Sequence, residues 1–231
     1  MFSEKILLAA FTVVTIIMSS TVHEWSHAMV ATKLGDDTPG RQGRVTLDPL
    51  QHIELFGTII LPLIGSMVGF LIGWARPVQF QPRNFRKDIT MRKGIILVAA
   101  AGPLSNIALL IFCSLLLKVL IIAVPEANFD TAPLLMGMGS FLAFMVYINM
   151  ILAVFNLMPI PPLDGFHILT NTLKPDSKVI ELMQEYQLLF FFIAIFIIFR
   201  VVIGPVQRLL SMWLNLLDIA PAFDMFFRAV A

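Results

Sequence analysis

The chain has 231 residues, of which 58% are hydrophobic and only 13% are charged. Because a soluble domain is about half apolar and about a quarter charged, this composition excludes a disordered chain, a coiled coil and a typical soluble enzyme. The net charge of +1 gives no electrostatic support for a nucleic-acid partner. The one cysteine, Cys113, excludes an internal disulfide and a cysteine-based metal site, so any metal ligands must be His, Asp or Glu.

Apolar runs along the chain predict an all-α polytopic membrane protein with about five to six membrane segments. The first segment, 5–33, begins with a lysine and an apolar run, as a signal peptide does. No small-x-small cleavage site follows this run, so we expect an uncleaved membrane helix that projects beyond the hydrocarbon. A polar loop rich in turn residues follows at 35–54.

The second segment, 55–74, is long enough to span a bilayer, but helix-breaking residues interrupt it: Gly57, Pro62, Gly65, Gly69 and Gly73. Irregular backbone within a bilayer is tolerated only where protein or water satisfies its polar groups. We therefore predict that this segment is re-entrant. The next loop, 75–93, contains six Lys or Arg residues against one Asp, so the positive-inside rule places it in the cytoplasm.

Three further membrane segments are expected at 94–123, 134–157 and 187–203. The loop that joins the first two carries acidic but no basic residues, which suits the outer side of the membrane. The stretch 205–219 places polar residues on one face at helical spacing, so we expect an amphipathic helix on the membrane surface. The chain thus divides into a membrane core, 1–204, and an amphipathic tail, 205–231.

The first segment carries the pattern H-E-x-x-H at His23, Glu24 and His27. Residues i and i+4 share one face of a helix, so both imidazoles can reach one metal ion. Glu24 lies beside that face, where it can take a proton from water at the metal. A competing interpretation is a helix end with capping polar residues, but ionisable groups at membrane depth are costly and usually functional. The motif predicts one catalytic zinc ion per chain.

A catalytic zinc site has three protein ligands and one water, so a third ligand is required. The candidates are Asp164, His167 and His52. Asp164 follows a proline-rich run at the end of segment 134–157, where it could instead cap the next helix. His167 is three residues away and competes with it, and His52 lies in a polar loop. The spacing leaves these alternatives open.

Two amides, Asn106 and Asn156, stand near the ends of apolar segments. One interpretation is hydrogen bonding between membrane helices. The other is donation of a hydrogen bond to a substrate carbonyl or oxyanion. The residues by themselves do not decide between the two.

Three motifs occur in the order found in site-2 proteases, which are zinc-dependent intramembrane peptidases. They are HEWSHA at 23–28, AGPLSN at 101–106 and FNLMPIPPLDG at 155–165. Two more, GRVTLDPLQHI at 43–53 and GWARPV at 73–78, resemble the compact prokaryotic branch that lacks PDZ and CBS domains. The resemblance covers residues 15–173. Asp48 stands where that branch usually has Asn, and Arg76 stands where Lys is usual; neither position is a ligand or the base.

This resemblance implies a role for each matching residue. His23, His27 and Asp164 match the zinc ligands, and Glu24 matches the general base. Asn156 matches an amide that assists substrate or transition-state binding, and Asn106 is a weaker match to the same role.

The resemblance also implies a topology and a substrate. The metal-bearing helix would run from outside to inside an integral protein of a prokaryotic cell membrane, with the active site nearer the cytoplasm. Short extended strands at 43–48 and 76–80 would pair with a locally unwound substrate. The expected activity is hydrolysis of peptide bonds within or near transmembrane segments of other membrane proteins, in contact with the lipid bilayer.

Two rival functions use the same polar residues. A membrane ion transporter could build an ion site from them, but transporters of this kind have internal repeats, and the sequence shows none. A catalytically silent relative that binds membrane helices would lack a ligand or the base, whereas all four residues are present here.

Overall fold

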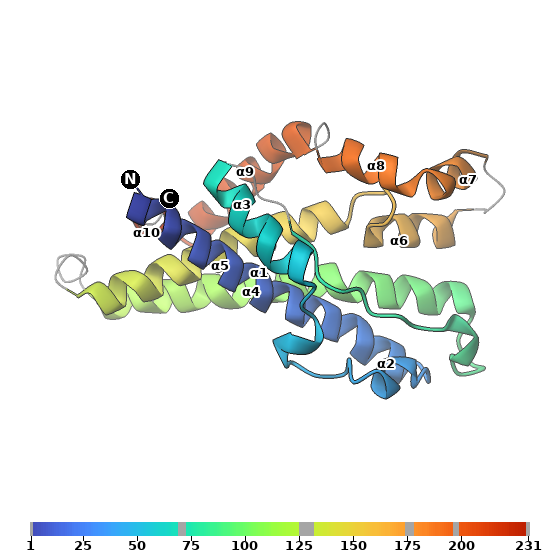
Figure 1. Ribbon diagram of the computed structural model, residues 1–231. Coiled ribbons are helices and arrows are strands. Elements are labelled where there is room, and N and C mark those ends of the chain that lie inside the picture. The colour runs from blue at the N-terminus through green and yellow to red at the C-terminus, as the bar shows by residue number, and fades with distance from the viewer. Residues whose placement is uncertain (1, 69–72, 125–131, 174–177, 196–198, 230–231) are drawn as a thin grey trace.

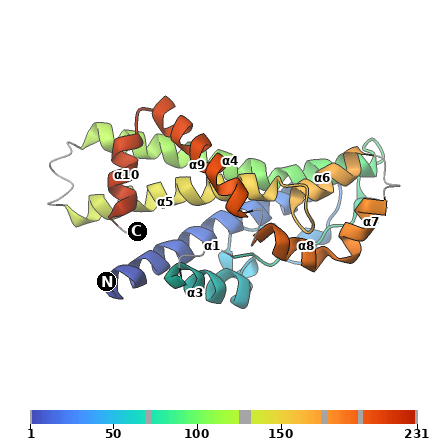
Figure 2. The same ribbon diagram turned by 90° about the horizontal axis from the view of Figure 1, so that it is seen from above.

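The computed structural model describes residues 2–68, 73–124, 132–173, 178–195 and 199–229, and every regular element within them is helical. Three long helices form the body of the molecule: α1 (Phe2–Lys33), α4 (Met91–Ala123) and α5 (Pro133–Asn156). Figures 1 and 2 show them running side by side along its length. The all-α prediction is confirmed.

Each long helix contains an apolar stretch that is long enough to cross a membrane. These stretches are Leu8–Lys33, Met91–Ala123 and Pro133–Asn156, with 26, 33 and 24 residues. At 1.5 Å per residue each exceeds the roughly 30 Å of a bilayer core. Three of the expected membrane segments are therefore present as helices that are long and apolar enough to span a bilayer, as in an integral membrane protein.

Ten shorter helices and turns surround this body (Figure 1). They are α2 (Thr38–Arg41), η1 (Pro49–Gln51), η2 (Leu55–Ile60), α3 (Leu61–Val68), η3 (Pro82–Asn84), α6 (Asp164–Thr172), α7 (Lys178–Glu185), α8 (Gln187–Ile193), α9 (Phe199–Leu216) and α10 (Ala220–Arg228).

The helix α4 is the centre of the packing, since it contacts α1, α5 and α6. Toward its C-terminal end it packs in a core shared with α5, α9 and α10. There Phe226 is fully buried against Gly139 of α5, where an added Cβ would lie 2.3 Å from the Phe226 ring. The close approach of α10 to α5 therefore requires glycine at position 139.

The expected segment 55–74 does not form one spanning helix. Its described part consists of the π-helical turn η2 and the short helix α3, and residues 69–72 lie outside the described chain. The two ends of the segment meet: Trp74 N–H donates to the Gly57 carbonyl over 3.0 Å, and Thr58 Oγ1 donates to the Trp74 carbonyl over 2.8 Å. These bonds hold the two ends of the segment together, and its re-entry into the membrane stays a prediction.

The expectation of five to six spans is not confirmed elsewhere either. Within 187–203, α8 has only 7 residues, residues 196–198 lie outside the described chain, and α9 begins at Phe199. The boundary placed between 204 and 205 falls inside α9. This amphipathic helix buries Val206, Leu210 and Leu214 at i, i+4 spacing.

The predicted short strands are not seen in the described residues. Segment 43–48 bends, beginning with Gly43 at φ 68°, so it cannot supply a straight edge. Segment 73–81 is extended but has no strand partner, because its N–H groups bond to loops and side chains instead. Local turn chemistry outweighs the strand pattern here.

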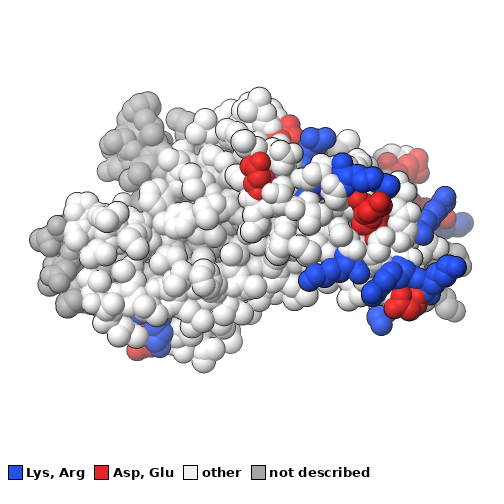
Figure 3. Space-filling view, turned by 90° about the horizontal axis from the view of Figure 1, so that it is seen from below, with Lys and Arg blue, Asp and Glu red and all other residues white. Residues whose placement is uncertain are grey.

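Charged side chains gather at one end of the molecule (Figure 3). This is the end at which Figure 1 places α2 and the start of α4. The exposed residues there include Arg83, Arg86, Lys87, Arg92 and Lys93. The opposite end shows few charged side chains in this view.

A buried carboxylate ties the loops of the charged end together. Asp36 is 0% exposed, and it accepts hydrogen bonds from the Thr38 hydroxyl at 2.6 Å, the Gln81 N–H at 2.6 Å and the Asn84 amide at 2.8 Å. Burial by itself would raise the pKa of Asp36, but the bonds from Thr38, Gln81 and Asn84 outweigh it and hold this pKa below its ordinary value. Asp36 therefore anchors the extended segment 73–81 to the end of α1.

We expect Asp36→Ala to destabilise the protein by about 3 kcal/mol, because it leaves the Thr38 hydroxyl, the Gln81 N–H and the Asn84 amide without this acceptor. The measurement is the midpoint of thermal unfolding in detergent. Asp37→Ala is the matched control: Asp37 is exposed and pairs only with Arg41, so its loss should cost less than about 1 kcal/mol. Equal effects of the two substitutions would contradict the anchoring role.

The stabilisation by Asp36 should depend on pH. A carboxylate whose pKa is lower in the folded than in the unfolded chain stabilises the fold above the unfolded pKa of about 4, and this stabilisation is lost as the pH falls through the folded pKa. The difference in unfolding midpoint between wild type and Asp36→Ala should therefore be constant near neutral pH and shrink below about pH 4. A difference that grows on acidification would contradict this.

Candidate metal centre

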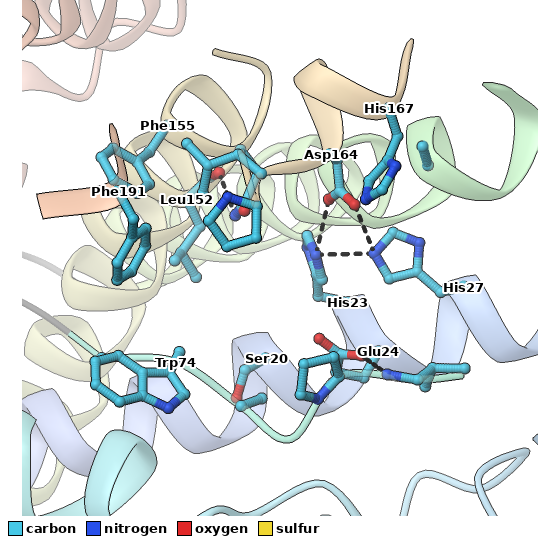
Figure 4. A pocket seen from close by; sticks show the side chains of 18 of the residues that line it. Ser20, His23, Glu24, His27, Trp74, Leu152, Phe155, Asp164, His167 and Phe191 are labelled. Atoms are coloured by element: carbon cyan, nitrogen blue, oxygen red, sulfur yellow. Dashed lines mark hydrogen bonds and ion pairs between the residues drawn. The ribbon is translucent and has the colours of Figure 1, made fainter. Parts of the chain in front are cut away.

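Two histidines of α1 face the same point. His23 and His27 lie one helical turn apart, and each is 8% exposed. Their Nε2 atoms are 3.0 Å apart. The spacing predicted that both rings share one helix face, and the structure turns this face toward α6 (Figure 4).

Asp164 completes the cluster from a different part of the chain. Its Oδ2 lies 3.2 Å from His23 Nε2, and its Oδ1 lies 3.4 Å from His27 Nε2. Asp164 is the first residue of α6, but it does not cap that helix; Leu163 occupies the cap position. Gly165 lets α6 close onto the end of α5, because a Cβ there would lie 2.2 Å from the Leu157 carbonyl oxygen.

The second ring nitrogen of each histidine is held by an acceptor. His27 Nδ1 lies 2.7 Å from the Val98 carbonyl oxygen, and His23 Nδ1 lies 2.7 Å from Asn106 Oδ1. A backbone carbonyl can only accept, so the proton of neutral His27 sits on Nδ1 and its Nε2 carries a free lone pair. Rings that bind metals are held by hydrogen bonds of this kind.

This donor set fits a zinc ion. The two Nε2 lone pairs and the Asp164 carboxylate converge, and the three ligand atoms lie within 4.8 Å of one another. The Asp164 Oδ2 atom is buried without a hydrogen-bond donor. Zinc bonds of about 2.0–2.2 Å in a tetrahedron place ligand atoms roughly 3.3–3.6 Å apart, close to the observed separations. The two Nε2 atoms and the Asp164 carboxylate thus form three electron-pair donors with no proton between them. Such a group requires a cation at its centre.

Glu24 lies beside this cluster at the wall of a cavity. The cavity has a volume of about 660 Å³ and is lined mostly by apolar side chains, among them Trp74, Phe155 and Phe191. Glu24 is 9% exposed, and its Oε2 accepts a hydrogen bond from the Val78 N–H over 2.8 Å. This bond fixes the carboxylate below His23 (Figure 4), within the cavity that the cluster also lines.

The structure gives the remaining candidate residues different positions. His167 lines the cavity but is not part of the ligand cluster. His52 is buried in its loop, where its Nε2 bonds the Thr46 carbonyl. Asn156 lines the cavity and donates to the Leu152 carbonyl over 2.9 Å. Asn106 lies behind His23 and is fully buried.

Some groups at the site were missed by sequence reasoning. They are the Val98 carbonyl, the Val78 N–H and the side chain of Asn149, which bonds Asn106. Main-chain groups carry no side-chain signal, so no pattern could have identified the first two. Asn149 is a lone amide within an apolar segment, the same signal that singled out Asn106 and Asn156.

Comparisons with known proteins agree with this site. The profile of Peptidase family M50 matches residues 11–199. The chain is 37% identical over 193 residues to "Putative zinc metalloprotease YwhC" of Bacillus subtilis, which is 82% of this chain and 81% of that protein. It is also 30% identical over 162 residues to "Putative zinc metalloprotease Rip2" of Mycolicibacterium smegmatis and of Mycobacterium tuberculosis, and this match covers 70% of the chain and 57% of Rip2. No solved structure matches the chain.

The profile match extends over most of the chain, and the match to YwhC extends over four-fifths of both proteins. The region matched by the profile includes the H-E-x-x-H motif at 23–27. The chain therefore belongs to Peptidase family M50, the site-2 protease family, and is a zinc metalloprotease.

Proposed function

We propose that the protein is an intramembrane endopeptidase that cleaves other membrane proteins within or near their transmembrane segments. In this proposal His23, His27 and Asp164 hold the zinc ion and Glu24 is the general base. The observation that carries it is the position of the ligand cluster and Glu24. Both line one apolar cavity beside α1 and α5, which are long enough to cross a membrane.

Zinc bound by the three ligands supplies Lewis-acid polarisation of water and of the scissile carbonyl. Glu24 accepts a proton from the attacking water and delivers it to the leaving nitrogen. The Val78 N–H holds one carboxylate oxygen of Glu24, which keeps the base from rotating away. Asn156 uses one of its two amide protons on Leu152, and we propose that the second stabilises the oxyanion.

A helical substrate must first unwind, because the carbonyls of a membrane helix are already hydrogen-bonded. The extended segment 73–81 offers an edge for the unwound chain. Trp74, Arg76 and Val78 direct their N–H groups toward the protein, where they bond Gly57, His52 and Glu24. In an extended chain the intervening residues point to the opposite edge, where Ala75 and Gln79 have an N–H to donate and Pro77 has only its carbonyl.

Several residues of this segment, Ala75 and Pro77 among them, line the cavity. A substrate strand added along the free edge would run past the zinc site. The substrate class we propose is therefore a single membrane-spanning segment that can be drawn out into an extended strand.

We also propose that the active site lies nearer the cytoplasmic side. Basic residues gather at one end of the molecule, and such an end faces the cytoplasm by the positive-inside rule. His27 precedes Lys33, the last residue of α1, by six residues, which is about 9 Å along the helix. Water can then reach the zinc from the charged end over a short distance.

The decisive experiment compares wild type with Glu24→Gln. The purified protein is assayed for bound zinc and for cleavage of a transmembrane peptide in detergent or liposomes. Gln keeps the hydrogen-bonding shape but cannot accept the proton, so zinc should remain bound while cleavage falls by about 10²-fold or more. Undiminished cleavage by Glu24→Gln would refute the proposed mechanism.

The ligand assignment has its own test. Asp164→Ala should weaken zinc binding by more than about 100-fold, because it removes a direct ligand, which matters more than an outer-shell partner. His167→Gln is the control: His167 is close by and a ligand by residue type, yet it lies outside the cluster, so its replacement should leave zinc affinity nearly unchanged. The dissociation constant is measured by competition with a chelator.

A substitution at Gly102 of α4 tests whether the proposed ligands need the space that this glycine leaves open. A Cβ at this position would lie 2.5 Å from the Nε2 atoms of both His23 and His27. Gly102→Ala should therefore displace the imidazoles and lower zinc affinity by at least about 10-fold. Gly137→Ala in α5 is the matched control, because a Cβ there meets no neighbour within 4 Å. Equal zinc affinity in both variants would contradict the contact.

A further inference from the structure

A row of buried polar side chains runs behind the zinc site, through the interior of the three spanning helices. Ser19 of α1, Asn106 of α4 and Asn149 of α5 are each 0% exposed. Polar groups buried at membrane depth are costly unless they find partners. None of the three lines the cavity. Their position therefore calls for an explanation other than contact with the substrate.

The row is one continuous chain of hydrogen bonds that ends at a proposed ligand. Asn149 Nδ2 donates to Ser19 Oγ at 2.9 Å and to the Met145 carbonyl at 2.8 Å. Asn106 Nδ2 donates to Asn149 Oδ1 at 2.8 Å. Asn106 Oδ1 in turn lies 2.7 Å from His23 Nδ1.

The Met145 carbonyl, at the end of this series of hydrogen bonds farthest from His23, determines which group donates in every bond. The Met145 carbonyl can only accept, so the NH₂ group of Asn149 must point to it and the Asn149 oxygen must point to Asn106. That oxygen also only accepts, so Asn106 must present its NH₂ group there and its own oxygen to His23. His23 must then carry its proton on Nδ1, which leaves the Nε2 lone pair free toward Asp164.

We propose that Asn149 and Asn106 form a one-way hydrogen-bond relay that fixes His23 in its zinc-binding tautomer, with the Met145 carbonyl as its anchor. Asn149 is a positioning residue: it acts on the metal site only through Asn106 and His23. The proposal rests on the ligand assignment made under the proposed function.

The comparison with His27 shows what the relay does. His27 obtains its tautomer directly from a backbone carbonyl, that of Val98. The Nδ1 atom of His23 faces an amide side chain instead, which could turn either its oxygen or its nitrogen toward the ring. Only the bond to Asn149 selects the oxygen. The relay thus carries the effect of a main-chain carbonyl across two helices to the second histidine.

The relay also gives Asn106 a role different from the one expected. The family resemblance assigned it weakly to substrate or transition-state binding. The structure places it behind His23, fully buried, with both ends of its amide occupied. Its position favours control of the ligand over contact with the substrate.

The test is the zinc dissociation constant of the full-length protein in detergent, measured by chelator competition. Asn149→Leu removes the oxygen that orients Asn106, so Asn106 can turn its nitrogen toward His23 and favour the tautomer with a protonated Nε2. We expect zinc affinity to fall by about 10-fold or more, the usual effect of losing an outer-shell partner. Thermal unfolding verifies that the variant is folded.

A second substitution separates tautomer control from packing. Asn106→Asp replaces the amide with a carboxylate, which has no nitrogen to present to His23. Adding it to Asn149→Leu should restore zinc affinity to within about 3-fold of wild type, as a carboxylate–histidine–zinc arrangement would. If Asn149 only packs the helices, the double variant binds zinc no better than Asn149→Leu, and the proposal is wrong.

Two further variants complete the experiment. Ser140→Ala is the control, because Ser140 is also a fully buried polar residue of α5 but bonds the Phe226 carbonyl away from the site; its zinc affinity should match wild type. If Asn149→Leu does not fold, Asn149→Ser replaces it, since a serine stays polar but is too short to reach Asn106. Unchanged zinc affinity in the folded Asn149 variant overturns the relay, whereas absence of zinc from wild type overturns the ligand assignment instead.

Discussion

The structure depends on three electron-pair donors, His23 Nε2, His27 Nε2 and the Asp164 carboxylate, which meet in an apolar interior. No proton lies between them. His23 and His27 each commit the Nδ1 side of the ring to an acceptor, so the Nε2 atoms can only face each other and Asp164 as electron donors. Without a cation, this arrangement would be repulsive. With one, α1 and α6 would be joined at the proposed active site. Metal binding and helix packing at this site are therefore one event.

The central helix α4 supplies most of the space and hydrogen bonds that position the two proposed histidine ligands. Gly102 makes room for both imidazoles, the Val98 carbonyl orients one of them, and Asn106 orients the other. In a membrane interior each of these polar groups must be satisfied by protein, since no bulk water is present to do it. The same requirement explains why Asn149 and Ser19 continue the chain of bonds until it reaches a backbone carbonyl.

The cavity side of the site is organised by loops. Arg44 is buried and donates to the carbonyls of Gln51 and Arg76, which ties the loop after α2 to the extended segment. Asp36 holds the far end of that segment, and Val78 within it holds Glu24. The proposed base on α1 is thus tied by a hydrogen bond to the segment whose edge is proposed for the substrate. A substrate bound along this edge would be aligned with the Glu24 carboxylate.

Much of the architecture follows from the sequence, because the long apolar runs determine three spanning helices and the i, i+4 spacing determines that His23 and His27 share a face. The H-E-x-x-H motif also predicts the metal and the base. Where the sequence pattern was weaker, the expectations were not confirmed: segment 187–203 is divided between α8 and α9, and the strand pattern at 43–48 ends in a bend. Propensity and periodicity are local, and tertiary contacts override them in short segments.

The sequence by itself determined that this is a helical membrane protein, and it predicted two metal ligands and a base on one helix. Spacing left the proposed third ligand open among Asp164, His167 and His52, and only the family resemblance pointed to Asp164, because spacing along the chain does not show which distant residues meet in the fold. The tertiary structure brought Asp164 to both imidazoles and buried His52 in its own loop. It also placed Val98, Val78 and Asn149 around the site, since contacts through main-chain groups and between distant helices are set by packing and leave no pattern along the chain.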